Sequence, residues 1–218
     1  MKINDLLMET VQDDQAISTI ATEITDYIKD NSEDFELNSK AIPISELIDF
    51  DPTDDSIEKL LAIKIEFGHI EFGHIGPNNA FGVYKHATKT IKINSEFLDM
   101  QLWDSIETNI VHELRHALDD IKSKGKLYKS KHLPRYRSAR NSDDINSAPA
   151  EINARLQQAQ HRMKGKIKRL SGIPTSSELT KIIFKCLKRY DLLDYFPEGT
   201  ADPAFKRIVG RMYRYARP

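Results

Sequence analysis

The sequence predicts an α+β fold with a small mixed or antiparallel sheet, one long helix that carries the candidate active site, and further helices toward the C-terminus. Apolar residues recur at three- and four-residue intervals over much of the chain, which indicates amphipathic helices. Three short apolar segments near the middle have the pattern and composition of strands. The 218 residues suffice for one domain of ordinary size, or for one domain with a helical appendage.

The N-terminal part is predicted to be helical and acidic. Residues 5–30 have isoleucines and leucines at helical spacing, with acidic residues on the opposite side. The following segment, 31–55, is acidic and irregular, and residues 44–50 within it could hold a short helix. We expect residues 1–60 to form an acidic N-terminal helical region.

Strands are predicted in residues 61–67, 81–84 and 90–93. The last two are separated by a short polar segment, so we expect them to form a hairpin. An exact tandem repeat, Ile65-Glu66-Phe67-Gly68-His69 followed by the same five residues in 70–74, is expected to lengthen a loop or a strand edge. Residues 90–93 directly precede the next helical stretch, and we expect this strand to be the edge on which an extended substrate lies.

The most informative motif is His112-Glu113-Leu114-Arg115-His116. Its surroundings predict an amphipathic helix, whose core-facing stripe consists of Trp103, Ile106, Ile110, Leu114, Ala117 and Ile121. His112 and His116 lie off this stripe and, being four residues apart, project from nearly the same side of the helix. Both imidazoles can therefore reach one metal ion, while Glu113 projects to the flank, where it can act as a base.

A catalytic zinc usually takes three protein ligands, so a third ligand must come from elsewhere in the chain. Glu151 is the preferred candidate, because it begins the next substantial helix between two alanines that permit a close helix crossing. The alternative is that Glu151 only stabilises a helix N-terminus and pairs with Arg155 one turn later. The competing candidates for the third ligand are Asp143, Asp144 and His132. Asp119 and Asp120 are better placed to accept a hydrogen bond from a ligand imidazole.

The remainder of the chain is basic. Residues 122–140 contain eight Lys or Arg and no acidic residue, which predicts a mobile loop or a segment ordered by an anionic partner. Helices are predicted from about 147 to 170, then over 176–193 and 203–216. We therefore expect a central domain in residues 61–170 and a basic C-terminal helical region in residues 171–218.

The charge of the chain is unevenly distributed along the sequence. Residues 1–60 carry sixteen acidic and four basic side chains, so the net charge of −1 conceals an acidic front and a basic remainder. The two parts could pack together or be solvated, or the basic part could bind an anionic partner such as nucleic acid or an acidic protein.

Cys186 is the single cysteine and is expected to be buried. We expect a cytoplasmic or other intracellular protein, without a secretory signal or membrane span.

The motif helix resembles those of the zincin metallopeptidases. Residues 112–120 are similar to the thermolysin-like pattern, in which an Asp four residues after the second His orients a ligand. The segment Ser147-Ala148-Pro149-Ala150-Glu151-Ile152-Asn153-Ala154-Arg155 is similar to the one that carries the third ligand in phage and bacterial regulatory peptidases of the ImmA/IrrE type. The resemblance covers residues 60–165. It departs from the thermolysin-like pattern at Arg155, where an acidic residue is expected, and in the longer spacing between His116 and Glu151.

The resemblance implies a zincin-like catalytic domain that binds one Zn²⁺ and hydrolyses peptide bonds of a protein substrate. Glu113 would then be the general base, which takes a proton from water and passes it to the leaving amine. A donor to the developing oxyanion is also needed. The candidates for this donor are Tyr128, His132, Tyr136 and Arg115.

Two other functions remain open from the sequence. The acidic start, the Lys-rich tail and the small size resemble products of tailed-phage genomes, which suggests a virion-associated structural or assembly protein that retains the zincin scaffold. A nucleic-acid-associated protein would instead use residues 122–140 and 162–217 to bind phosphates around a structural metal. Proteolysis that a chelator abolishes would favour the enzyme, whereas steeply salt-dependent DNA affinity would favour the second alternative.

Overall fold

The computed structural model describes residues 11–31, 40–52, 54–68, 70, 82–125, 149–170, 172–196 and 201–216. The chain divides into two compact units. One unit, here called the sheet unit, comprises residues 15–129; the other, the helical unit, combines residues 1–14 with 130–218. The described residues form seven α-helices and one four-stranded sheet, which confirms the predicted α+β class. The sequence-based boundaries at residues 60 and 170 stay predictions.

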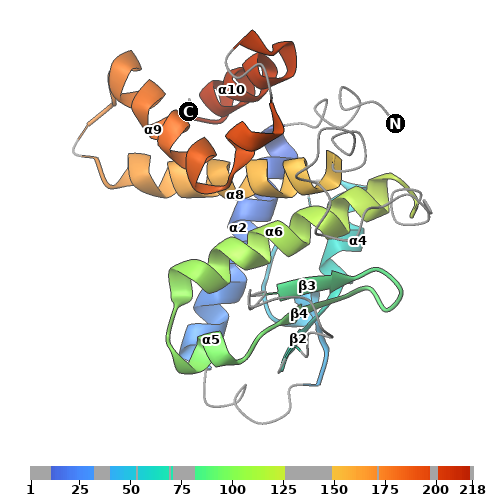
Figure 1. Cartoon of the computed structure of the whole chain (residues 1–218). Coiled ribbons are helices and arrows are strands. Elements are labelled where there is room, and N and C mark those ends of the chain that lie inside the picture. Colours follow the sequence, from blue (N-terminus) through green and yellow to red (C-terminus); the bar gives the residue numbers. More distant parts are fainter. Residues whose placement is uncertain are drawn as a thin grey trace. The chain divides into compact units, whose positions relative to one another are not determined.

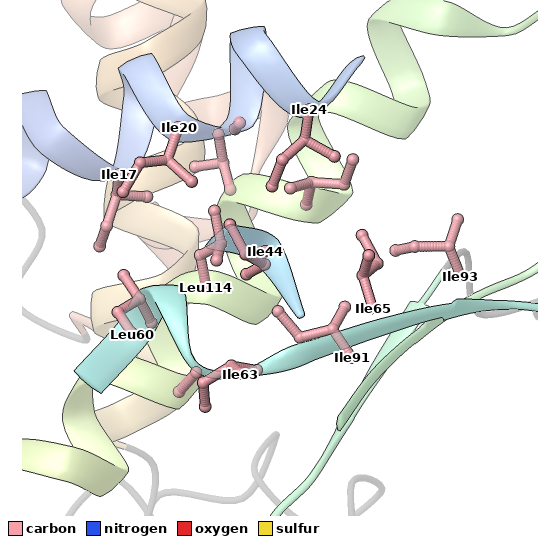
Figure 2. Packing of buried hydrophobic residues seen from close by; sticks show 14 of the residues in the cluster. Ile17, Ile20, Ile24, Ile44, Leu60, Ile63, Ile65, Ile91, Ile93 and Leu114 are labelled. Carbon is pink, nitrogen blue, oxygen red and sulfur yellow. The ribbon is translucent and has the colours of Figure 1, made fainter. Parts of the chain in front are cut away.

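The predicted N-terminal helix is present as α2, Val11–Asp30. Its apolar side is fully buried, because Ile17, Ile20, Ile24 and Ile28 recur at the three- and four-residue spacing that keeps them on one side. Figure 2 shows three of these isoleucines above the strand residues Ile65, Ile91 and Ile93. The core of the sheet unit therefore lies between α2 and the sheet, with the motif helix also contributing.

Two short helical segments precede the sheet. The short helix expected in residues 44–50 is a 3₁₀ turn, Ile44–Glu46. Helix α4, Asp55–Leu61, was not predicted. The Asp54 carboxylate accepts hydrogen bonds from the backbone N–H groups of Ser56 (2.7 Å) and Ile57 (3.1 Å), which is the usual chemistry of a helix N-cap.

The sheet contains β1 (Ile42–Pro43), β2 (Lys64–Phe67), β3 (Gly82–Lys85) and β4 (Thr90–Ile93), in the order β1-β2-β4-β3. Strands β3 and β4 pair antiparallel, which confirms the predicted hairpin, and β2 pairs with β4 in parallel. The expectation that residues 90–93 form the sheet edge is wrong, because β4 has a partner on each side. Among the described strands, β3 lies at that edge. Half of the tandem repeat, residues 69 and 71–74, falls outside the described residues.

The motif lies on α6, Trp103–Lys122, which follows the single-turn helix α5, Glu96–Asp99. Helix α6 crosses the sheet and contacts β3 and β4 (Figure 1). The middle of its apolar stripe is buried, with Ile110 and Leu114 fully so, while Trp103 and Ile121 at its two ends are partly buried. Gly125 follows the end of α6: this residue has a φ of 74°, and its N–H donates to the carbonyl of Asp120 at 2.9 Å.

The described part of the helical unit comprises α8 (Pro149–Lys168), α9 (Ser176–Arg189), the 3₁₀ segment Leu192–Tyr195 and α10 (Pro203–Ala216). These helices enclose a second apolar core, in which Cys186 is buried as expected. Helix α9 begins with a capping box between Thr175 and Glu178. No helix of the described residues has the length and apolarity needed to cross a membrane.

Candidate metal centre

The two histidines of the motif face each other on α6. Their Nε2 atoms are 3.0 Å apart, and the two rings are nearly perpendicular. Two nitrogens bound to one tetrahedral zinc at about 2.0–2.1 Å would be about 3.3 Å apart. His112 is 6% exposed and His116 is partly buried, so little rearrangement of the pair would be needed to bind one ion.

Glu151 joins the two histidines as a candidate ligand. His112 and His116 belong to the sheet unit and Glu151 to the helical unit. The three side chains offer two imidazole nitrogens and a carboxylate oxygen as candidate ligands of one metal ion. Two imidazoles and a carboxylate are a donor set that suits zinc. By donor type, the residues present therefore fit the metal that the motif implies.

The pairing of Glu151 with Arg155 is also present. Oε1 of Glu151 accepts a hydrogen bond from Nε of Arg155 at 2.7 Å, and Arg155 reaches Asp191 at 3.3 Å. The Arg155 guanidinium also lies 5.6 Å from the centre of the Tyr195 ring. These contacts hold Arg155, and through it Glu151, in one orientation at the beginning of α8. The pairing with Arg155 considered for Glu151 is therefore present, and its role as a metal ligand stays a prediction.

Glu113 is held against the edge strand. Its Oε2 accepts a 2.7 Å hydrogen bond from the backbone N–H of Tyr84 in β3, and the residue is 5% exposed. Gly82 permits this approach, because a Cβ atom there would lie 3.3 Å from Cγ of Glu113 and 3.0 Å from Cδ1 of Ile93. Strand β3 therefore fixes the carboxylate that the motif presents as a base.

Asp120 is the centre of a polar network with the hairpin. Its Oδ2 accepts hydrogen bonds from the Tyr84 hydroxyl and from Nδ1 of His86, both at 2.7 Å, and from Nζ of Lys89. Burial opposes ionisation of Asp120, but the hydrogen bonds from Lys89, Tyr84 and His86 outweigh it and lower the pKa of this carboxyl. Burial, together with the Asp120 carboxylate, raises the pKa of the Tyr84 hydroxyl above its ordinary value.

Asp119 has a different partner on its own helix. Its Oδ1 accepts from Nε of Arg115 at 2.9 Å and lies 2.8 Å from a terminal guanidinium nitrogen of the same residue. Both side chains are fully buried, so Arg115 is poorly placed to donate to a substrate oxyanion. An interaction of Asp119 or Asp120 with a ligand imidazole stays a prediction.

The sequence reasoning missed Gly82, Tyr84, His86 and Lys89. The hairpin that carries them was predicted, but no local pattern indicates which of its residues would meet a helix about 30 residues later. The remaining candidates of the sequence analysis lie outside the described residues: Tyr128, His132, Tyr136, Asp143 and Asp144. Most of the basic segment 122–140 lies outside them as well.

No family model, curated protein or solved structure gives a match to this chain.

Proposed function

We propose that the protein is a zinc-dependent peptidase with a zincin-like catalytic domain, which hydrolyses peptide bonds of a protein substrate. The observation that carries the proposal is the facing pair of Nε2 atoms of His112 and His116, 3.0 Å apart. Glu151 is the proposed third ligand, because its carboxylate completes the donor set. Glu113 lies between the two histidines in the sequence and is buried against β3. A metal site and an adjacent carboxylate are the minimum that this chemistry requires.

Each residue has a separate role in this proposal. His112, His116 and Glu151 would hold the ion, which when bound supplies Lewis-acid polarisation of a carbonyl group and lowers the pKa of water. Glu113 accepts the proton from the attacking water and returns it to the leaving amine. The N–H of Tyr84 restrains one oxygen of Glu113, so that the carboxylate does not have to be ordered during the reaction.

Strand β3 is the proposed support for the substrate backbone. It is the edge strand beside α6 among the described strands, and Val83 on it is 36% exposed. An extended peptide could add to this edge through main-chain hydrogen bonds, which give affinity with little dependence on sequence. The substrate would thereby lie next to Glu113, which contacts the same strand.

The test is hydrolysis of a dye-labelled, unfolded protein by the zinc-loaded chain and by a Glu113→Gln variant. We expect turnover in the parent, its loss on chelation and its return on adding zinc. The variant should lose roughly 100-fold or more of the rate, because general base catalysis contributes about that much. A Glu96→Gln variant, which removes a carboxylate of α5, is the matched control and should retain the parent rate. Equal rates for parent and Glu113→Gln would refute the proposed base.

A further inference from the structure

The helical unit has a large excess of positive charge. Its described residues, 11–14, 149–170, 172–196 and 201–216, contain fourteen Lys or Arg and seven Asp or Glu. None of these charges is needed for the proposed hydrolysis except those of Glu151 and its partner Arg155. The remaining cations therefore call for a separate explanation.

The acidic side chains of this unit are mostly engaged in local structure. Glu151 and Asp191 both contact Arg155. Glu178 belongs to the capping box of α9, and the Asp202 carboxylate accepts a hydrogen bond from the N–H of Ala204 at 2.7 Å. They neutralise little of the charge on the outer sides of α8 and α9.

Helices α8 and α9 pack against each other, and each carries a pair of cations (Figure 1 shows the two helices). Arg162 and Lys166 are one helical turn apart on α8, and Lys185 and Arg189 are one turn apart on α9. Burial raises the pKa of the Cys186 thiol, and the charges of these four cations oppose that rise. We call Arg162, Lys166, Lys185 and Arg189 the α8–α9 cationic face.

The α8–α9 cationic face is at least partly exposed, and no acidic side chain of the described residues pairs with it. Lys185 and Arg189 are exposed, and Arg162 and Lys166 are partly exposed. Within the described chain, none of the four forms an ion pair, whereas Arg155 and Arg211 of the same unit do. The buried Nε of Arg162 has no hydrogen-bond acceptor among the described residues. Four like charges held together without counter-charges repel one another, which an anionic partner would relieve.

We propose that the α8–α9 cationic face binds the phosphate backbone of a nucleic acid. Phosphates suit this face because arginine and lysine supply charge-assisted hydrogen bonds to their oxygens. A protein partner would be expected to need apolar contact area, since interface cores are enriched in aromatic residues and depleted of lysine. The large, exposed apolar residues of the described helical unit, Leu170 and Ile173, lie in the α8–α9 connection and not among the four cations.

The experiment measures binding of the full-length protein to a fluorescent 20-base-pair DNA duplex and to a single-stranded RNA, at several salt concentrations. Each phosphate contact contributes about −0.9 to the slope of log K against log[salt] for duplex DNA. A Lys166→Gln/Lys185→Gln double variant should bind more weakly, and its slope should be smaller by about 2. A Lys29→Gln/Lys59→Gln double variant is the charge-matched control, because Lys29 on α2 and Lys59 on α4 are exposed and paired with Asp26 and Asp55, and it should leave the slope unchanged.

The possible results separate the partners. Tighter binding of one nucleic acid than of the other identifies which of them supplies the phosphates. Tighter binding of polyglutamate than of either nucleic acid would overturn the proposal in favour of an acidic protein. The proposal would also be overturned if the parent bound neither nucleic acid at low salt. The same holds if the double variant were folded and kept the parent's slope of log K against log[salt]. Circular dichroism and thermal unfolding establish that each variant is folded. Because binding is the readout, the result does not depend on whether the protein hydrolyses peptides.

Discussion

The backbone N–H of Tyr84 donates a 2.7 Å hydrogen bond to Oε2 of Glu113. This contact links an edge strand to the carboxylate that we propose as the general base, across 29 residues of sequence. The Tyr84 hydroxyl also donates to Asp120, two turns further along the same helix. Strand β3 therefore holds α6 at two points, one on each side of His116.

Gly82→Ala should disturb the base without removing any ligand. The new Cβ would lie 3.0 Å from Ile93 Cδ1 and 3.3 Å from Glu113 Cγ and from the Lys92 carbonyl oxygen, so neighbouring atoms must move. We expect a loss of about 1–3 kcal/mol in the free energy of unfolding, as overpacking usually causes. Peptide hydrolysis should fall by roughly tenfold to a hundredfold at unchanged zinc content, because misplacement of a catalytic group slows the reaction. Urea unfolding, elemental analysis and initial rates measure the three effects.

Gly210→Ala is the matched control for this substitution. Gly210 lies in α10, and a Cβ atom there would meet nothing within 4 Å. Alanine should raise the free energy of unfolding by about 0.5–1 kcal/mol, because glycine is unfavourable inside a helix. If both variants lose equal stability and activity, the close approach at Gly82 is not what positions Glu113.

Asp120→Asn should make stability less sensitive to acid. The pKa of Asp120 lies below its ordinary value, so the ionised carboxylate stabilises the fold above about pH 4. That contribution is lost as the pH falls through the lower pKa of the folded state. Urea unfolding between about pH 2 and pH 6, with chelator present, should show a smaller loss of stability in the variant than in the parent. Parallel curves would mean that this carboxylate titrates alike in the folded and unfolded chain.

Arg115→Met should be among the more destabilising substitutions in α6. Arg115 and Asp119 are both fully buried and paired at 2.8 Å, so removing one leaves a buried charge without this partner. We expect a loss of about 3–5 kcal/mol in the free energy of unfolding. The double variant Arg115→Met/Asp119→Leu should recover much of that loss, since apolar residues can replace a buried ion pair. A double variant with the sum of the two single losses would show that other contacts of these residues dominate.

The sequence was sufficient for elements whose signal is local. The helix over residues 103–122, the strand 90–93 and the hairpin follow from periodicity and turn chemistry, and the spacing of His112 and His116 follows from helix geometry. The edge strand could not be assigned in this way, because strand order depends on tertiary pairing. Helix α4 was missed because its seven residues are too few for a clear period. The partners of Glu113 and Asp120 were missed because those contacts are long-range.

Zinc content measured by elemental analysis, on chelator-free protein reconstituted with one equivalent of zinc, tests the central claim most directly. We predict one zinc per chain in the parent and in Glu113→Gln, none in His112→Ala or His116→Ala, and weaker binding in Glu151→Gln. If Glu151→Gln binds zinc as tightly as the parent, the third ligand is another residue, with Asp143 or Asp144 tested next. A parent without zinc, with stability unchanged in both histidine variants, would contradict the metal centre itself.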